Sequence, residues 1–344
     1  MYWLRQMLEQ SQIDRLGTGT AKVGLLLNPL SGRIRKHIDA IRRMLARIPG
    51  AVCREVTSAS EIGASVDAFL QADIDLLVII GGDGTVQAVL THLFTTRPAK
   101  WPVLTIVPGG TTNMTALDLG IHDKPEVILR QLSDCLSQQT APVLLQRPVL
   151  CIEQPGATKI YGMFFGVGLI AHAVIFSRSK VKRLGITGEI YSGIIMLGYL
   201  AGVILGRRHG PWAPIRMSII EASEEVRNGT YLFLFASALD RLLFSMRPYW
   251  GREQEPLHVT FVEQQRNHPW RALWLLLSGH SDAIKEQDGY HSHNTSALEL
   301  LMDDDYIIDG EFHRATSQDG PLRISAAGPV TFLVPGDKNT DPQQ

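Results

Sequence analysis

Short apolar runs that alternate with helical periods are the feature that most constrains the fold of this chain. Between residues 22 and 140, the runs KVGLLL, DLLVII and PVLTIV each precede apolar residues spaced as one face of a helix. After the first run, the spacing from Ile34 to Ile48 predicts one continuous helix. Strands that are apolar throughout and interleaved with helices form a parallel sheet covered on both faces. Ligands of such sheets bind at the carboxyl ends of the strands.

The pattern changes after Pro142. Short strand-like segments divided by turn residues fill the second half, among them RPVLCIE, KIYGMFFGV, TYLFLFASA and VTFLVP. This pattern is typical of antiparallel sheets, and Asn228-Gly229 is a hairpin signal within it. We predict an α/β domain with a parallel sheet and a C-terminal antiparallel β-sandwich domain. Their predicted limits are 22–142 and 143–335, with an N-terminal extension at 1–21 and a flexible tail at 336–344.

Charge and cysteine content exclude several classes of protein. The chain has 33 basic and 34 acidic residues and a formal net charge of -1, so it has no general attraction to nucleic acid and we expect no such partner. Its three cysteines form no CxxC pair, which argues against a disulfide framework or a zinc site. The first residues lack the apolar core and cleavage site of a signal peptide. We therefore expect a cytoplasmic protein.

Three glycine-bearing polar loops follow the predicted parallel strands. The first is NPLSGR, with Asn28 and Ser31; the second is Gly81, Gly82, Asp83, Gly84 and Thr85; the third is PGGTTN, with Gly109, Thr111 and Asn113. Glycine lets the backbone approach a ligand closely, and free N–H groups at the start of the next helix favour an anion. A tight turn without a ligand is the alternative for any single loop. Together, at one edge of a sheet, the three loops predict a site for several phosphates.

The motifs NPxSG, GGDGT and PxGTxN, in this order and followed by a late DGE, resemble the diacylglycerol kinase-like lipid kinases. That family includes sphingosine kinases and bacterial lipid kinases. The resemblance implies a first domain that binds ATP, a second that helps to bind lipid, and a site in the cleft between them. By position, Asn28 and Ser31 would contact the nucleotide, Gly81 to Thr85 its phosphates, and Gly109, Thr111 and Asn113 the opposite wall.

The DGE motif lies in the sequence YIIDGEF, where Gly310 separates two carboxylates. Phosphoryl transfer needs a group that orients the attacking hydroxyl and cations that neutralise the γ-phosphate. In the resembled family the aspartate acts as general base and the glutamate lies near the metal, which implies Asp309 as the catalytic residue and Glu311 near Mg²⁺. We expect Asp83 to share the metal. The alternative is a solvated acidic turn, since MDDDYIIDGE is strongly acidic.

The chain departs from the resembled family at several positions. Met114 stands where the family usually has an aspartate, and Gln87 and Ala88 stand where a glutamate is common. The sequence WGREQEPLHV replaces a turn that holds a structural magnesium ion in some members, so we expect no such ion here. These departures leave open whether activity is weak.

Two apolar segments are candidates for contact with a lipid. Between Glu189 and Arg207 the chain carries no charge, but the segment is short for a membrane span and contains four glycines. A helix lining an acyl-chain groove, with basic flanks touching the membrane surface, is one reading. In HPWRALWLLLSGH, Trp270, Leu273, Trp274 and Leu277 share a helix face, for which we expect core packing. Peripheral membrane contact is thus expected, and the sequence leaves homodimer formation open.

The sequence therefore predicts an ATP-dependent lipid kinase that phosphorylates a hydroxyl of a diacylglycerol-like lipid. An NAD kinase-like enzyme shares GGDG and a two-domain plan, but NPxSG and the late DGE argue against it. A catalytically weak protein that binds nucleotide or lipid is the alternative from a different class, suggested by Met114. Motifs do not encode which lipid is the substrate.

Overall fold

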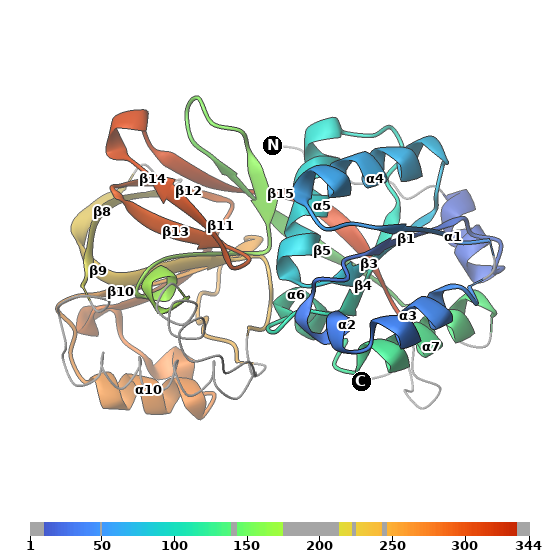
Figure 1. The fold of residues 1–344 in the computed structure, drawn as a ribbon. Coiled ribbons are helices and arrows are strands. Elements are labelled where there is room, and N and C mark those ends of the chain that lie inside the picture. Colours follow the sequence, from blue (N-terminus) through green and yellow to red (C-terminus); the bar gives the residue numbers. More distant parts are fainter. Residues whose placement is uncertain are drawn as a thin grey trace. The chain divides into compact units, whose positions relative to one another are not determined.

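The computed structural model describes residues 10–48, 50–138, 143–174, 213–221, 225–242 and 246–335 (Figure 1). The chain forms two compact units. The first comprises the chain up to Arg147 together with the chain from Gly328, and the second is Pro148–Ala327. The apolar segment between Glu189 and Arg207, with its basic flanks, lies outside the described residues, as do the first nine residues and the tail at 336–344.

The first unit is built on a parallel sheet. Its strands run in the order β2, β1, β3, β4 and β15. Their bounds are β1 Val23–Leu27, β2 Val52–Glu55, β3 Leu76–Gly81, β4 Val103–Pro108 and β15 Leu322–Val334. Every residue of β1, β3 and β4 is buried, whereas the edge strand β2 is exposed along its length. Continuous apolar sequence thus marks the central strands, as expected for a sheet covered on both sides.

Helices cover the sheet of the first unit. They are α2 Gly32–Lys36, α3 Ile38–Leu45, α4 Ala59–Gln71, α5 Asp83–Thr96, α6 Met114–Asp118 and α7 Pro125–Leu136. Figure 1 shows α4 and α5 on one face, and α2, α3 and α7 on the other. Burial of Val86, Val89 and Leu93 fixes the inner side of α5. The predicted α/β fold of this half is confirmed.

Two details of the first unit differ from expectation. The predicted helix from Ile34 to Ile48 is two helices, because His37 has φ -129° and ends α2 before α3 begins. We also expected the second domain to extend to residue 335. The end of β15 instead pairs with β4 through Phe332 and Leu104, which places the chain from Gly328 in the first unit.

The second unit consists mainly of antiparallel strands. Its pairings follow the order β14, β13, β7, β9, β8, β12 and β15, and β10 joins β9 to β11. The bounds are β5 Val143–Glu153, β6 Ile160–Gly162, β7 Phe164–Gly168, β8 Ile215–Glu221, β9 Val226–Ser237, β10 Leu257–Glu263, β11 Tyr290–Thr295, β12 Ala297–Met302, β13 Asp304–Ile308 and β14 Glu311–Ala315. Strand β5 begins in the first unit. The predicted antiparallel half is confirmed.

The hairpin predicted at Asn228-Gly229 is wrong in position. Both residues lie inside β9, where they pair with Ser218 and Met217 of β8. The Ser218 hydroxyl donates to Asn228 Oδ1 at 2.6 Å, so the side chain that would favour a turn serves a cross-strand contact. Propensity at one dipeptide is overridden by the pairing of the whole strand.

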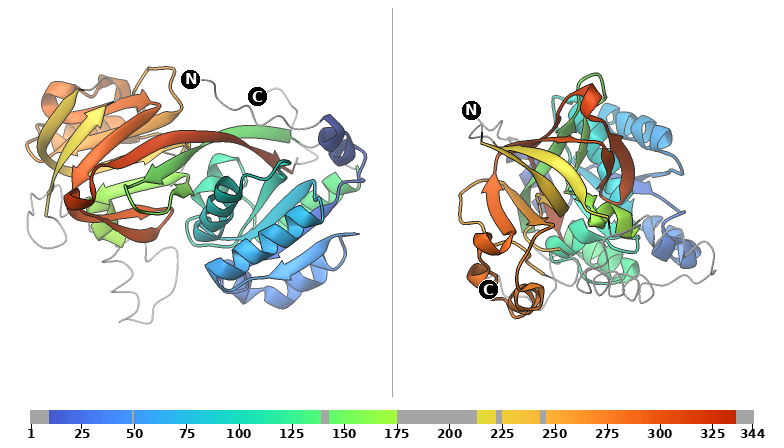
Figure 2. Two further views of the ribbon diagram at one scale, coloured as in Figure 1. Left: turned by 90° about the horizontal axis from the view of Figure 1, so that it is seen from above. Right: turned by 90° about the vertical axis from the view of Figure 1, so that its left-hand side faces the viewer.

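Helix α1, Gln10–Gly17, is part of the first unit and not a separate extension (Figure 2, dark blue). Its residue Leu16 is buried, and Gln12 Nε2 donates to the carbonyls of Asp75 and Trp101. Arg15 donates both Nε and Nη2 to the Asp75 carboxylate at 2.9 and 2.6 Å. Residues far apart in sequence are joined through one buried carboxylate.

The charge of Asp75 is well compensated. Burial by itself would raise the pKa of this carboxyl, but hydrogen bonds from Arg15, the Lys22 amide and Lys100 outweigh it and lower the pKa to about 2.

No helix among the described residues is both long enough and apolar enough to cross a membrane.

Replacing Asp75 by Asn should destabilise the protein by about 2 kcal/mol at pH 7, since the charged form is favoured in the folded state. A lowered folded-state pKa contributes stability above the unfolded value near 4, and this contribution is lost as pH falls toward 2. Urea unfolding at a series of pH values measures the difference between wild type and variant. Asp73→Asn is the control, because Asp73 is 63% exposed and also bonds Lys100. Equal pH dependence in wild type and Asp75→Asn would refute this account.

Candidate active site

The three glycine-bearing loops lie together at the carboxyl edge of β1, β3 and β4. The Asn28 amide donates to the Ile80 carbonyl at 2.9 Å, and the Gly109 amide donates to the Gly81 carbonyl at 2.7 Å. The Arg33 amide donates to the Gly109 carbonyl at 2.8 Å. Backbone hydrogen bonds therefore join the first loop to β3 and the third loop to both of the others.

Close backbone contact between loops explains several of the glycines. A Cβ on Gly110 would lie 2.8 Å from the Cα of Gly82, and a Cβ on Gly109 would lie 2.4 Å from Cγ1 of Ile34. A Cβ on Gly81 would lie 2.7 Å from Oγ1 of Thr85. These positions lack room for a side chain because of neighbouring protein atoms, whether or not a ligand is bound.

Asn28 and Thr85 join the first two loops by a side-chain hydrogen bond. Asn28 Nδ2 donates to Thr85 Oγ1 at 2.9 Å, and Asn28 Oδ1 accepts from the Leu30 amide at 3.0 Å. Thr85 is buried within the first turn of α5. Both polar atoms of the Asn28 side chain are thus engaged inside the protein.

Asn113 shapes the third loop. Its Oδ1 accepts from the Gly110 amide at 2.7 Å and its Nδ2 donates to the Gly110 carbonyl at 2.8 Å. The residue has φ 50°, a conformation that asparagine tolerates better than most residues, and it is buried. Thr111, between these two residues, is exposed.

Asp83 links the second loop to the third. Its carboxylate is buried at the start of α5, and burial raises its pKa. Polar groups of the third loop and of the start of α6 oppose that rise in pKa. The Thr115 amide donates to Asp83 Oδ1 at 3.4 Å. This hydrogen bond joins the start of α5 to the start of α6.

The predicted residues of the loops therefore divide into two groups. The first group is held inside the protein: Asn28, Thr85 and Asp83 bond across loops, Asn113 bonds within its own loop, and Gly81 and Gly109 are buried. Gly82, Gly84 and Ser31 are partly exposed and Thr111 is exposed, so these four line the surface that a ligand can reach. Gly82 precedes α5, whose first N–H groups have no acceptor within the helix. The carboxyl edge of the sheet therefore offers free backbone N–H groups to an anion.

Asp309 occupies a tight turn between β13 and β14. It and Gly310 have φ 47° and 86°, the sign pattern of a type I′ hairpin for which Asp-Gly is favoured. Its Oδ2 accepts from the Met163 amide at 2.9 Å and its Oδ1 from the Phe164 amide at 3.0 Å. The residue is only 6% exposed. The alternative of a solvated acidic turn is wrong for Asp309, although Glu311 is exposed.

Gly162 is a residue that sequence reasoning missed. A Cβ at this position would lie 2.5 Å from Asp309 Oδ2 and 2.5 Å from Cγ2 of Ile308. Gly162 ends β6, and the amides that hold Asp309 follow it directly. The dipeptide YG in KIYGMFF gave no signal for this role, because the partner is 147 positions away in the sequence.

Residues 22–144 match the model of the diacylglycerol kinase catalytic domain. The chain is similar to the diacylglycerol kinase-like lipid kinases, as its motifs predicted. The match supports a lipid kinase at the level of the family. The sequence matches none of the curated proteins.

Solved structures extend the likeness in fold beyond the catalytic domain match. Three crystal structures of proteins from Bacillus anthracis str. Sterne resemble this chain, two provisionally assigned as diacylglycerol kinases and one described as a diacylglycerol kinase. Their TM-scores are 0.64, 0.63 and 0.59, at 16%, 15% and 14% identity. Each comparison covers 91% of this chain and 96% of the other. At such identities the likeness shows the two-part fold.

The predicted magnesium ligands Asp83 and Glu311 belong to different compact units. Within the described ranges, no group of three or more His, Cys, Asp or Glu side chains forms a metal site. Asp83 is buried at the start of α5 and its Oδ1 accepts from the Thr115 amide at 3.4 Å, so its role as a magnesium ligand stays a prediction. Glu311, exposed at the first position of β14, is the other predicted ligand, and its role stays a prediction.

Replacing Gly110 by Ala should push the second and third loops apart, since the new methyl group would meet the backbone of Gly82. We expect a loss of about 1–3 kcal/mol in the free energy of unfolding. Gly32→Ala is the matched control: a Cβ there has no neighbour within 4 Å, and Gly32 is the first residue of α2. Urea unfolding compares the two variants, and equal stability would contradict the packing argument.

Proposed function

We propose that the chain is an ATP-dependent lipid kinase that transfers the γ-phosphoryl group to a hydroxyl of a diacylglycerol-like lipid. The observation that supports this most is the hydrogen-bonded set of three loops at one sheet edge, within the segment that matches the diacylglycerol kinase catalytic domain. Backbone amides at a helix start bind phosphate without a dedicated lysine. The sequence has no Gly-Lys-Ser/Thr motif of the P-loop type, and this is therefore compatible with nucleotide binding.

The exposed half of the loop set would contact ATP. The backbone at Gly82 and Gly84 would bind the phosphates at the start of α5, and Ser31 and Thr111 would offer hydroxyls from either side. Arg33 ends the first loop, and its backbone amide donates to the Gly109 carbonyl, so its side chain would offer a cation near the same edge. Cations at this position neutralise charge on the transferred group.

Asp309 would act on the lipid hydroxyl. The hydroxyl oxygen forms a bond to the γ-phosphorus, the bond from phosphorus to the β–γ bridging oxygen breaks, and ADP leaves with that electron pair. The hydroxyl proton passes to the Asp309 carboxylate. Two backbone amides hold this carboxylate in one orientation, while lone pairs remain for the substrate. Magnesium, when bound, would neutralise the charge on the phosphates.

A second candidate is a protein that binds nucleotide or lipid with little or no transfer. The observation in its favour is that Asp83 is buried and that Met114 supplies no carboxylate beside it. Neither position then offers an exposed carboxylate to a metal ion.

Incubation of purified protein with γ-labelled ATP, magnesium and a total lipid extract should yield one labelled, extractable lipid. NAD in a parallel reaction tests the NAD kinase-like alternative. Labelled NAD with unlabelled lipids would favour that enzyme. Nucleotide binding by calorimetry without any labelled product would favour the non-catalytic candidate.

Changing Asp309 to Asn should reduce turnover by at least 100-fold, since its proton acceptor is lost. The amide group of Asn would face a backbone N–H, so we also expect a loss of about 1–3 kcal/mol in stability. Turnover is therefore measured at a temperature where circular dichroism shows the variant folded.

Gly162→Ala should lower kcat by displacing the Asp309 carboxylate.

Asp305→Asn is the control for these two variants. Asp305 lies on the same hairpin, is 39% exposed and pairs with Arg314, so turnover should stay unchanged. Unaltered kcat in folded Asp309→Asn would remove Asp309 from the mechanism.

A further inference from the structure

Helix α10, Pro269–Leu277, belongs to the second unit (Figure 1) and exposes large apolar side chains. Figure 2 shows the same unit from two further sides. Trp270 and Trp274 are each 64% exposed. We expected both to pack in the core with Leu273, so that expectation is wrong. The two indoles are one helical turn apart and share the outer face with Arg271 and Ser278, which are also exposed.

The inner side of α10 is already occupied. Leu275 is buried, and Ala272 packs with Ile284 against a buried cluster that contains Tyr290 and Val262. The exposed tryptophans are therefore not a core face left unfilled. A helix that is apolar on both its inner and outer sides is typical of a buried helix or of one that contacts a membrane.

Tryptophan suits the boundary between water and lipid because its ring is apolar and its Nε1 donates a hydrogen bond. Trp274 is supported in its exposed position by His280, whose ring lies parallel to it at 3° with centroids 6.4 Å apart. The exposed face of α10 carries no acidic residue. Its charge comes from Arg271 alone.

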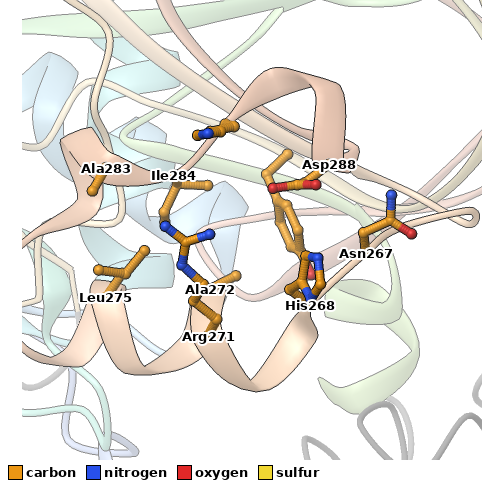
Figure 3. Close-up of a pocket in the computed structure, with 10 residues that line it drawn as sticks. Asn267, His268, Arg271, Ala272, Leu275, Ala283, Ile284 and Asp288 are labelled. Carbon is orange, nitrogen blue, oxygen red and sulfur yellow. The ribbon is translucent and has the colours of Figure 1, made fainter.

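Arg271 also lines a shallow pocket between α10 and the segment that precedes β11 (Figure 3). Lys285 and His268 contribute to the same lining, and Asp288 is its single carboxylate. Within the described part of the chain, neither Arg271 nor Lys285 forms an ion pair with a carboxylate. Two cations without an ion pair complement the phosphate of a lipid headgroup.

We propose that α10 docks the protein on a phospholipid bilayer, with Trp270 and Trp274 in the interface and Arg271 and Lys285 against lipid phosphates. This inference rests on the proposed function, since a lipid kinase must reach a substrate held in a membrane. Asp282, Glu286 and Asp288 follow the helix closely and offset the local positive charge. The indoles therefore dominate binding, and zwitterionic vesicles retain most of the affinity.

Co-sedimentation with vesicles of phosphatidylcholine, with and without phosphatidylglycerol, tests the proposal. The double variant Trp270→Ala/Trp274→Ala should bind both vesicle types at least tenfold more weakly than wild type. Arg271→Gln should weaken binding to the anionic vesicles by about threefold and to the zwitterionic vesicles by less. Val52→Ser is the control, because Val52 is an exposed apolar residue of the first unit; its binding should equal that of wild type.

Kinase assays separate this proposal from the proposed function. With a short-chain, water-soluble diacylglycerol, the double tryptophan variant should phosphorylate as well as wild type, and with vesicle-embedded substrate it should be slower. Equal vesicle binding by wild type and double variant overturns the docking surface while leaving lipid kinase activity intact. If vesicle binding depends on the tryptophans but no labelled lipid forms in the kinase assay, the docking surface stands and the lipid kinase function is refuted.

The alternative to a bilayer is that a second copy of the chain binds the exposed face of α10. Analytical ultracentrifugation of wild type and double variant distinguishes it from a bilayer. A wild-type monomer supports the proposal, whereas a dimer that the double variant abolishes overturns it.

Discussion

The contact between the backbones of Gly82 and Gly110 sets the distance between the second and third loops, and most of the candidate site depends on it. At this separation the Gly109 amide reaches the Gly81 carbonyl, and the Asp83 carboxylate reaches the amides that begin α6. Because a Cβ on Gly110 would lie 2.8 Å from the Gly82 Cα, the two loops meet through peptide groups and not through side chains. The N–H groups at the start of α5 then need no rearrangement to meet an anion, which keeps the cost of ordering small.

In the second unit, Asp309 is likewise held by hydrogen bonds from backbone amides. A carboxylate that accepts two backbone amides keeps one orientation without help from a flexible side chain, and the type I′ turn places it at the end of a hairpin. In both units a glycine is needed where a side chain would not fit. Gly162 leaves room for Oδ2 of Asp309, and Gly82 leaves room for the backbone of Gly110. In both units, backbone groups position the polar atoms, so side-chain identity matters most where a Cβ would intrude.

Sequence reasoning predicted the parts of the structure that depend on local pattern. The buried strands β1, β3 and β4 followed from continuous apolar runs, and the meeting of three loops followed from parallel order. It failed where long-range contacts decide. The sequence around Asp83 does not indicate that its carboxylate accepts a hydrogen bond from the backbone at the start of α6. Likewise, the sequence WRALW does not distinguish a helix face that packs in the core from one that is exposed. Asn228-Gly229 has turn chemistry, yet strand pairing with β8 prevails.

The departures from the resembled family can be understood through these contacts. Asp83 accepts from the backbone amide of Thr115 and not from a side chain at position 114, so Met114 leaves the third loop in place. Gln87 and Ala88 lie in α5 beyond the turn that contacts the other loops, and Thr85 still receives the hydrogen bond from Asn28. The departures therefore change the acidity available to a metal ion and spare the loop architecture. The architecture of the loops and the acidity available to a metal ion are therefore separate features of this chain, because the first resides in backbone groups and the second in carboxylates.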